Sequence, residues 1–166
     1  MHKVRTYIIL LLFAVFITGN APRAWLLTEP QAVRCVLHHF FHANIFHLAV
    51  NCLAVWTMFP KGWSEHREEL LVSFAVGSLS ALAAPWPVIG FSNTLFSVLG
   101  YRAARYGWYR TAQFVVLVAA VLLTAIITGI SGLTHILSLA GGFAASMAAS
   151  TYRKLSSDYG KARGDK

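Results

Sequence analysis

The feature that most constrains the fold is the division of the chain into apolar segments bounded by charged residues, proline or glycine. Of its 166 residues, 57% are hydrophobic and only 12% are charged, about half the charged fraction of a soluble domain. Six apolar segments can be distinguished: Tyr7–Asn20, His47–Phe59, Leu70–Ala84, Ser92–Arg102, Thr111–Ile130 and His135–Ser150. Only the fifth has the length of about 20 residues that a regular transmembrane helix needs. The pattern predicts an all-α, polytopic membrane protein of six transmembrane helices with a short central fourth helix.

The positions of the basic residues predict the topology. With the N-terminus inside, twelve of the fourteen Lys and Arg residues lie on the inner side, and only Arg23 and Arg34 lie outside. This agrees with the positive-inside rule and predicts a multi-pass membrane protein with both termini cytoplasmic. The basic flanks fit a bacterial inner membrane, and an organelle membrane would give similar signals. Residues 1–152 are expected to form the membrane domain and residues 153–166 a basic, mobile cytoplasmic tail. The net charge of +8 then reflects topology and contact with the lipid bilayer, and we expect no nucleic-acid partner.

The first segment has a second interpretation. Met1–Arg5 is basic, Tyr7–Ile17 is apolar, and small residues follow as far as Ala24. A cleavable signal peptide has the same arrangement. Because the cleavage-site pattern is poor and the later segments need partners, we expect the first helix to be retained.

Ser92 is an unusual residue within the short fourth segment. A helix from Ser92 to Arg102 rises only about 15 Å, half of a hydrocarbon core of about 30 Å. If Arg102 marks the membrane surface, the Ser92 hydroxyl lies near mid-membrane. Residues 85–90 before it contain two prolines and cannot form a regular helix. Irregular backbone at that depth is stable only when it is buried in protein or lines a wet cavity, so Ser92 is a candidate nucleophile.

His135, at the start of the sixth segment, is the candidate base. The residues that follow it on the same helix face are small: Ser138, Gly142 and Ser146. The fourth segment has a comparable face, formed by Ser92, Phe96 and Gly100. Such faces allow two helices to pack at close range, and their docking would bring Ser92 beside His135. The alternative is that these small residues serve packing alone.

The acidic residues narrow the possible chemistry. The chain has only six Asp and Glu residues, and none lies within a predicted span. An intramembrane aspartyl pair is therefore excluded, and the metalloprotease pattern His-Glu-x-x-His is absent. A Ser-His-Asp triad would lack its third member at membrane depth. If the chain is a hydrolase, a Ser-His dyad is the arrangement left.

The second segment begins in a histidine-rich stretch. His47 and Asn51 are four residues apart and lie on one face of a helix that enters the membrane. An imidazole and a carboxamide directed at one point can stabilise an oxyanion. His38 and His42 are also four apart, so haem or metal ligation is a competing interpretation. No carboxylate or cysteine has the spacing to complete such a site, and we expect neither a metal nor a cofactor.

The ordered set of motifs resembles the rhomboid family of intramembrane serine proteases. The matching pieces are His42-x4-His47-x3-Asn51, Gly90-x-Ser92, and His135 followed by Gly142. They extend from Val33 to about Ser150, which is essentially the whole rhomboid core.

The resemblance implies a role for each matching residue. Ser92 would be the nucleophile and His135 the general base and acid, while His47, Asn51 and the Ser92 backbone N–H would form the oxyanion hole. Supporting positions would be Gly90, Phe96, Gly142 and Arg34. Phe96 would stand where the family has an aromatic beside the histidine, and Arg34 matches the arginine of the family's Trp-Arg pair in the first outer loop. The implied activity is endopeptidase cleavage of transmembrane protein substrates through an acyl-enzyme. The oligomeric state is not predicted.

Three positions depart from the family pattern. Asn93 replaces the last glycine of Gly-x-Ser-Gly, Val33 replaces the Trp before Arg34, and Ser138 stands where glycine usually follows the histidine. Asn93 could either narrow the cavity or supply a hydrogen-bond donor. An alternative function is therefore a catalytically inactive rhomboid-like protein that binds membrane helices.

Overall fold

The structure is a computed structural model that describes residues 4–19, 31–59, 62–83, 88–106 and 132–163. In this part of the chain the secondary structure is helical, and no β-strand occurs. The helices are α1 (Val4–Thr18), α3 (Gln31–Leu37), the 3-10 helix η1 (His38–Phe40), α4 (Ile45–Met58), α5 (Trp63–Ala81), α6 (Ser92–Tyr106) and α8 (Gly132–Arg163). The predicted all-α class is confirmed.

The helices follow the predicted apolar segments with shifted ends. α1, α4, α5, α6 and α8 cover the first, second, third, fourth and sixth segments, respectively. The fifth segment, Thr111–Ile130, lies outside the described residues. The short helices α3 and η1 occupy the connection before α4, in a region between the first and second predicted segments. α6 continues to Tyr106, past the expected end at Arg102.

Only one described helix is long and apolar enough to cross a membrane. This is α8, over Gly132–Tyr159. The helix pair Gln31–Phe40 and Ile45–Met58 passes the same test jointly but is bent by 78°, and α1 is apolar but shorter. The number of membrane spans therefore stays a prediction.

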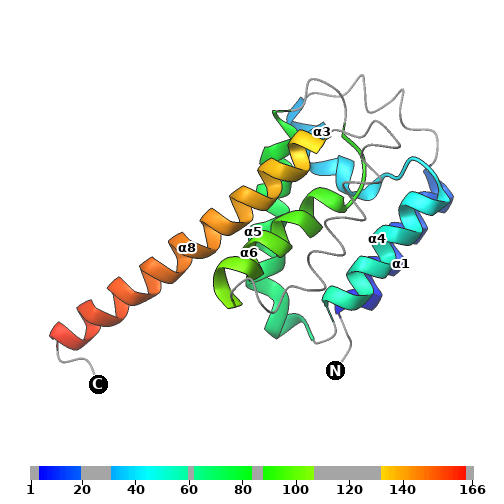
Figure 1. Cartoon of the computed structure of the whole chain (residues 1–166). Coiled ribbons are helices and arrows are strands. Elements are labelled where there is room, and N and C mark those ends of the chain that lie inside the picture. Colours follow the sequence, from blue (N-terminus) through cyan, green and yellow to red (C-terminus); the bar gives the residue numbers. More distant parts are fainter. Residues whose placement is uncertain (1–3, 20–30, 60–61, 84–87, 107–131, 164–166) are drawn as a thin grey trace.

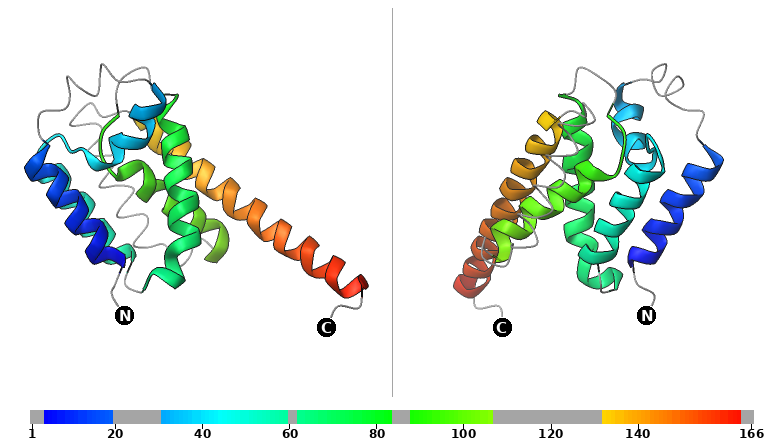
Figure 2. Two further views of the ribbon diagram at one scale, coloured as in Figure 1. Left: turned by 180° about the vertical axis from the view of Figure 1, so that it is seen from behind. Right: turned by 45° about the vertical axis from the view of Figure 1, so that its right-hand side comes forward.

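α6 is the central helix of the molecule. It packs chiefly on α8 and also on α5, and α5 packs on α8 (Figure 1). α4 packs on α1 and makes far fewer contacts with α6 (Figure 2). Every side chain of α6 from Ser92 to Tyr101 is buried, so its first turn is held on several sides by other helices.

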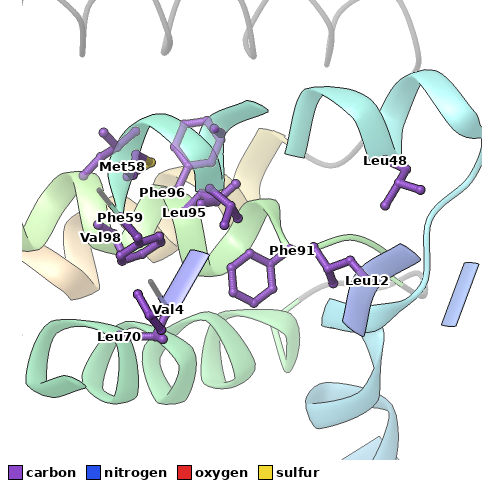
Figure 3. Close-up of a cluster of buried hydrophobic side chains, with 13 residues drawn as sticks. Val4, Leu12, Leu48, Met58, Phe59, Leu70, Phe91, Leu95, Phe96 and Val98 are labelled. Carbon is purple, nitrogen blue, oxygen red and sulfur yellow. The ribbon is translucent and has the colours of Figure 1, made fainter. Parts of the chain in front are cut away.

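The apolar core connects these helix groups near the first half of α6. Its side chains come from α1, α4, α5, α6 and the residue before α6 (Figure 3). Leu12, Leu48, Val55, Phe59 and Val98 are completely inaccessible. This packing fixes where α4 lies relative to the start of α6.

The far end of α6 is anchored by charged groups. Arg102 donates hydrogen bonds to both carboxylate oxygens of Glu69 on α5 and, over 2.7 Å, to the carbonyl of Met58. Glu68 accepts hydrogen bonds of 2.7 Å from the Tyr101 hydroxyl and from Arg153 of α8. Two neighbouring glutamates of α5 thus link α4, α6 and α8.

α8 extends beyond the rest of the molecule (Figure 1). Its 32 residues rise about 48 Å, more than the thickness of a hydrocarbon core. Tyr152, Leu155 and Tyr159 are exposed on its second half. The predicted domain division after residue 152 falls within this continuous helix, and the mobility of residues 153–166 stays a prediction.

Candidate active site

Ser92 and His135 lie within hydrogen-bond distance of each other. The Oγ atom of Ser92 is 2.9 Å from Nε2 of His135, although 43 positions separate the two residues in the sequence. Ser92 is the first residue of α6, and His135 lies in the first turn of α8. Both side chains are buried, at 8% and 3% exposure. The predicted proximity of these two residues is confirmed.

Glycines allow α6 and α8 to approach closely enough for this contact. A Cβ atom on Gly142 would collide with the backbone carbonyl of Ser97, and one on Gly100 would collide with that of Leu139. The two backbones are therefore in direct contact at both glycines. The predicted faces of small residues do dock, and Gly142 acts from two turns away by setting the distance between the helices.

The imidazole of His135 is oriented by an aromatic ring. Phe96, one turn after Ser92 on α6, stacks on His135 with ring centroids 4.5 Å apart and an interplanar angle of 18°. Among the described residues, Nδ1 of His135 has no hydrogen-bond partner. The arrangement is thus a dyad, in which ring stacking takes the orienting position that a carboxylate holds in a triad.

Gly90 precedes the serine in a conformation that favours glycine. Its φ is +110°, a region that residues with a Cβ atom rarely adopt. A Cβ atom at this position would also lie 2.7 Å from Nε2 of His47 and 3.5 Å from Nδ2 of Asn51. His47 and Asn51 therefore converge on the backbone just before Ser92, and their role as oxyanion donors stays a prediction.

The start of α4 fixes His47 and Asn51. Asn44 is the N-cap of the helix, and its side-chain oxygen accepts a hydrogen bond of 2.9 Å from the backbone N–H of His47. Asn51 donates one amide hydrogen to the carbonyl of His47 over 3.1 Å, which leaves its second amide hydrogen for another acceptor. Sequence analysis missed Asn44, although an Asn directly before an apolar helical run is a recognised start signal.

A small apolar cavity adjoins the nucleophile between α4 and α6. Its space is about 280 Å³ when the open solvent at its mouth is included. Its lining comprises Val50, Asn51, Ala54, Ser92, Leu95, Phe96 and Leu99. Only Asn51 and Ser92 contribute polar side chains, so the cavity suits an apolar group held next to the serine and the proposed oxyanion donors.

The helix start at Ser92 adds backbone donors. The first N–H groups of an α-helix have no partner within the helix and carry partial positive charge. The N–H of Leu95 bonds the carbonyl of Phe91, the residue before α6. The N–H of Ser92 therefore precedes the regular hydrogen bonding of the helix, at the end where a negative charge is stabilised.

Two other predicted positions lie away from the dyad. Arg34 is in α3, and no contact with Ser92 or His135 appears among the described residues. Asn93 is completely buried and its Nδ2 lies 3.5 Å from Nε2 of His38. Of the two possibilities left open for Asn93, the hydrogen-bond donor is the one observed.

The histidines do not form a ligand cluster in the part of the chain that the structure describes. His42 packs edge-to-face on His47, with ring centroids 5.1 Å apart. No group of three or more His, Cys, Asp or Glu residues there could hold a metal ion. The competing interpretation as a haem or metal protein therefore finds no ligand set among these residues.

Comparisons with known proteins leave this site to be interpreted from its own geometry. No protein-family model matches the chain, and no curated protein matches it significantly.

Proposed function

We propose that this protein is an intramembrane serine endopeptidase that cleaves transmembrane segments through a dyad of Ser92 and His135. The observation that carries the proposal is the 2.9 Å separation between Ser92 Oγ and His135 Nε2. A serine hydroxyl is a weak nucleophile until an adjacent base takes its proton. A buried histidine stacked on Phe96 is such a base, held in one orientation.

The reaction follows from this geometry. Ser92 Oγ attacks the carbonyl carbon of a peptide bond while its proton passes to Nε2 of His135. The protonated imidazole then gives that proton to the leaving amine of the C-terminal fragment, and the N-terminal fragment stays on Ser92 as an ester through its carbonyl carbon. A water molecule, deprotonated by His135, hydrolyses the ester and restores the hydroxyl. No cofactor takes part in these steps.

The negative charge of the tetrahedral intermediate needs donors on the other side of the carbonyl. The N–H of Ser92, the His47 imidazole and the second amide hydrogen of Asn51 are the candidates. His47 and Asn51 both approach the backbone at Gly90, two residues before the nucleophile. Donors fixed in a buried site stabilise such a charge more strongly than mobile ones in water.

The substrate class follows from the cavity and from helix chemistry. The cavity beside Ser92 is lined mostly by apolar side chains and suits a side chain from a membrane segment. A transmembrane helix hides its carbonyl groups in hydrogen bonds, so it must unwind locally before attack. We therefore expect substrates with Gly or Pro near the cut, and the family resemblance adds small residues at the cleavage site.

The same proposal places the chain in a bilayer as a six-helix, rhomboid-like bundle with both termini cytoplasmic. Large apolar side chains are exposed along α1, including Leu10 at 61% and Ile17 at 71%. Exposed apolar faces of this kind are stable against lipid. The positive-inside distribution of charge supports the orientation.

Cleavage of a test substrate carrying one transmembrane helix would decide the function. The wild type, Ser92→Ala and His135→Ala should be compared in liposomes. We expect cleavage by the wild type only, and equal cleavage by all three would contradict the dyad. Absence of cleavage together with absence of labelling by a serine-reactive fluorophosphonate would favour the inactive, helix-binding alternative.

A further inference from the structure

Behind Ser92, away from His135, lies a second set of buried polar side chains. They come from three elements that are distant in sequence: His38 and His39 of η1, Ser78 of α5, and Asn93 and Thr94 of α6. His38, His39, Asn93 and Thr94 are each at most 1% exposed. Burying this many polar groups is costly unless they satisfy one another, and the mechanism proposed above uses none of them.

His39 bridges α5 and α6. Its Nε2 lies 3.0 Å from the hydroxyl oxygen of Ser78, and its Nδ1 lies 3.2 Å from that of Thr94. A neutral imidazole has one donor and one acceptor nitrogen, and a hydroxyl can serve as either. Both nitrogens of His39 are therefore satisfied in either tautomer, and the ring ties the first turn of α6 to α5.

His38 holds the segment that leads into Ser92. Its backbone carbonyl accepts a hydrogen bond of 2.8 Å from the N–H of Gly90. Its Nδ1 lies 2.8 Å from the carbonyl of Cys35, and because a carbonyl can only accept, Nδ1 carries the proton. Nε2 is then an acceptor and faces the Nδ2 donor of Asn93 at 3.5 Å. His38 therefore contacts the chain on both sides of Ser92, at Gly90 before it and at Asn93 after it.

Gly77 shows how closely α5 approaches the same turn. A Cβ atom on Gly77 would lie 2.9 Å from the backbone N of Thr94, 3.0 Å from the carbonyl carbon of Asn93 and 3.1 Å from the His39 ring. The backbone that follows Ser92 is therefore enclosed by α5 as well as by η1. This close packing is a separate observation from the hydrogen bonds described above, and it also restricts the position of the first turn of α6.

We propose that His38, His39 and Thr94 are positioning residues that hold the first turn of α6, so that the hydroxyl and the N–H of Ser92 keep their reactive geometry. The inference rests on the proposed function. The Ser92 hydroxyl must stay in contact with His135 while the Ser92 N–H points at the oxyanion. A shift of about 1 Å in a reacting group can lower the rate of the reaction by about a hundredfold. Asn93, in the place of the usual glycine, adds a contact to this support.

The test is the rate at which a fluorophosphonate labels Ser92 in Thr94→Val and in Thr94→Ser. Valine keeps the shape of threonine but removes the hydroxyl that contacts His39, whereas serine keeps the hydroxyl. We expect labelling about tenfold slower in Thr94→Val and within about twofold of wild type in Thr94→Ser. On the test substrate, kcat should fall with labelling while KM stays within about twofold, because the substrate contacts are unchanged.

Thr57→Val is the matched control. Among the described residues, the Thr57 hydroxyl bonds only carbonyls of its own helix, those of Leu53 and Ala54, and its loss should leave labelling unchanged. If Thr94→Val does not fold, Ser78→Ala replaces it, with Ser80→Ala as its control because Ser80 bonds the Val76 carbonyl of its own helix. In that case, labelling that is slower in Ser78→Ala but unchanged in Ser80→Ala would support the inference.

The failure of this inference can be told from failure of the proposed function. Labelling of Thr94→Val, or of Ser78→Ala where that variant replaces it, at the wild-type rate overturns the positioning role and leaves the dyad intact. Equally slow labelling of Thr94→Val and Thr94→Ser also overturns it, since the hydroxyl would then not be the cause. A wild-type protein that is not labelled at all would overturn the proposed function itself and the inference with it.

Discussion

At the scale of single residues, the site depends on positions where only one residue type fits. Gly90 has a φ of +110°, and the His47 ring occupies the space where its side chain would be. Ser92 is placed by being the first residue of α6. The pattern Gly-x-Ser in the sequence was enough to single out this turn, but only the structure shows that the glycine makes room for His47.

Gly90→Ala should therefore damage both stability and reactivity. The strained backbone costs about 1–3 kcal/mol, and the added methyl group must displace the His47 ring, whose Cε1 and Nε2 would lie 2.6 and 2.7 Å from it. We expect a lower midpoint of thermal unfolding in detergent and fluorophosphonate labelling slower by about tenfold or more.

Gly132→Ala provides the comparison for this prediction. A Cβ atom on Gly132, the first residue of α8, would meet nothing within 4 Å. That substitution should leave labelling unchanged. Equal effects of the two substitutions would show that the space beside His47 is not what requires a glycine at position 90.

The residues that carry chemistry were predictable to different degrees. His47 and Asn51 were found from their offset of four, which places them on one helix face. Ser92 was found from its depth in the short fourth segment, and His135 from the face of small residues that follows it. His39 and Thr94 were not found, since their contact joins residues 55 positions apart and no local pattern marks it. Arg34 was expected as a supporting residue, yet the described residues show no link to the dyad.

At the scale of elements, the site is produced by the contact between α6 and α8. Helices associate within lipid by close packing rather than by the hydrophobic effect, so the glycines at this contact determine the distance from Ser92 to His135. The sequence predicted which faces dock. It did not predict that α6 runs on to Tyr106 or that α8 continues to Arg163, because charged residues such as Arg102 were interpreted as helix ends.

Alanine substitutions at the neighbouring residues Gly141 and Gly142 can distinguish the effect of the backbone contact between α6 and α8 from the effect of added side-chain volume in general. A Cβ atom on Gly142 would collide with the backbone of Ser97, whereas one on Gly141 would lie 2.7 Å from the end of the Val76 side chain, which can rotate. Gly142→Ala should cost about 1–3 kcal/mol in unfolding free energy and abolish cleavage. Gly141→Ala should cost less and keep activity; the reverse order would contradict this view of the interface.

The glutamates of α5 stabilise the opposite end of α6. The Tyr101 hydroxyl, and then Arg153, hold the pKa of Glu68 below its ordinary value of 4.5. A lowered pKa in the folded state means that the stabilisation is complete above pH 4.5 and is lost as the pH falls through the lower, folded value. Because half of the Glu68 side chain is exposed, we expect only about 0.2–1 kcal/mol at neutral pH.

Glu68→Gln tests this contribution. Its unfolding midpoint should lie slightly below that of the wild type at pH 7, and the difference should shrink as the pH is lowered below 4.5 and as salt is added. A difference that is constant with pH would mean that the charge of Glu68 does not matter. Glu69 is not equivalent, since it is buried and binds Arg102 through both carboxylate oxygens.

At the scale of the whole molecule, the proposed function requires a bilayer around the helices. The sequence predicts six spans, and among the helices that the structure describes only α8 meets the length and composition of a full span. α1 is shorter, the pair of α3 with η1 and α4 is bent, and the fifth segment lies outside the described residues. Short helices cannot be assigned to a membrane by length alone. The packing of α6 against both α5 and α8 is a tertiary contact, and the periodicity of apolar residues in the sequence does not encode it.

The topology is testable with a reporter that is active only in the cytoplasm. Fused to either end of the chain, it should be active in both cases, because twelve basic residues are expected on that side. Mass spectrometry of the mature protein should find the N-terminal residues intact. Loss of the chain before about residue 24 would instead support the signal-peptide interpretation of the first segment.

The most direct test of the central claim is to treat the purified protein with a fluorophosphonate and locate the adduct by mass spectrometry. The account predicts one adduct, on Ser92, absent from Ser92→Ala and formed on the order of a hundredfold more slowly in His135→Ala, since a positioned base contributes at least that factor. An adduct on another residue, or equal labelling of the wild type and His135→Ala, would contradict the claim that His135 activates Ser92.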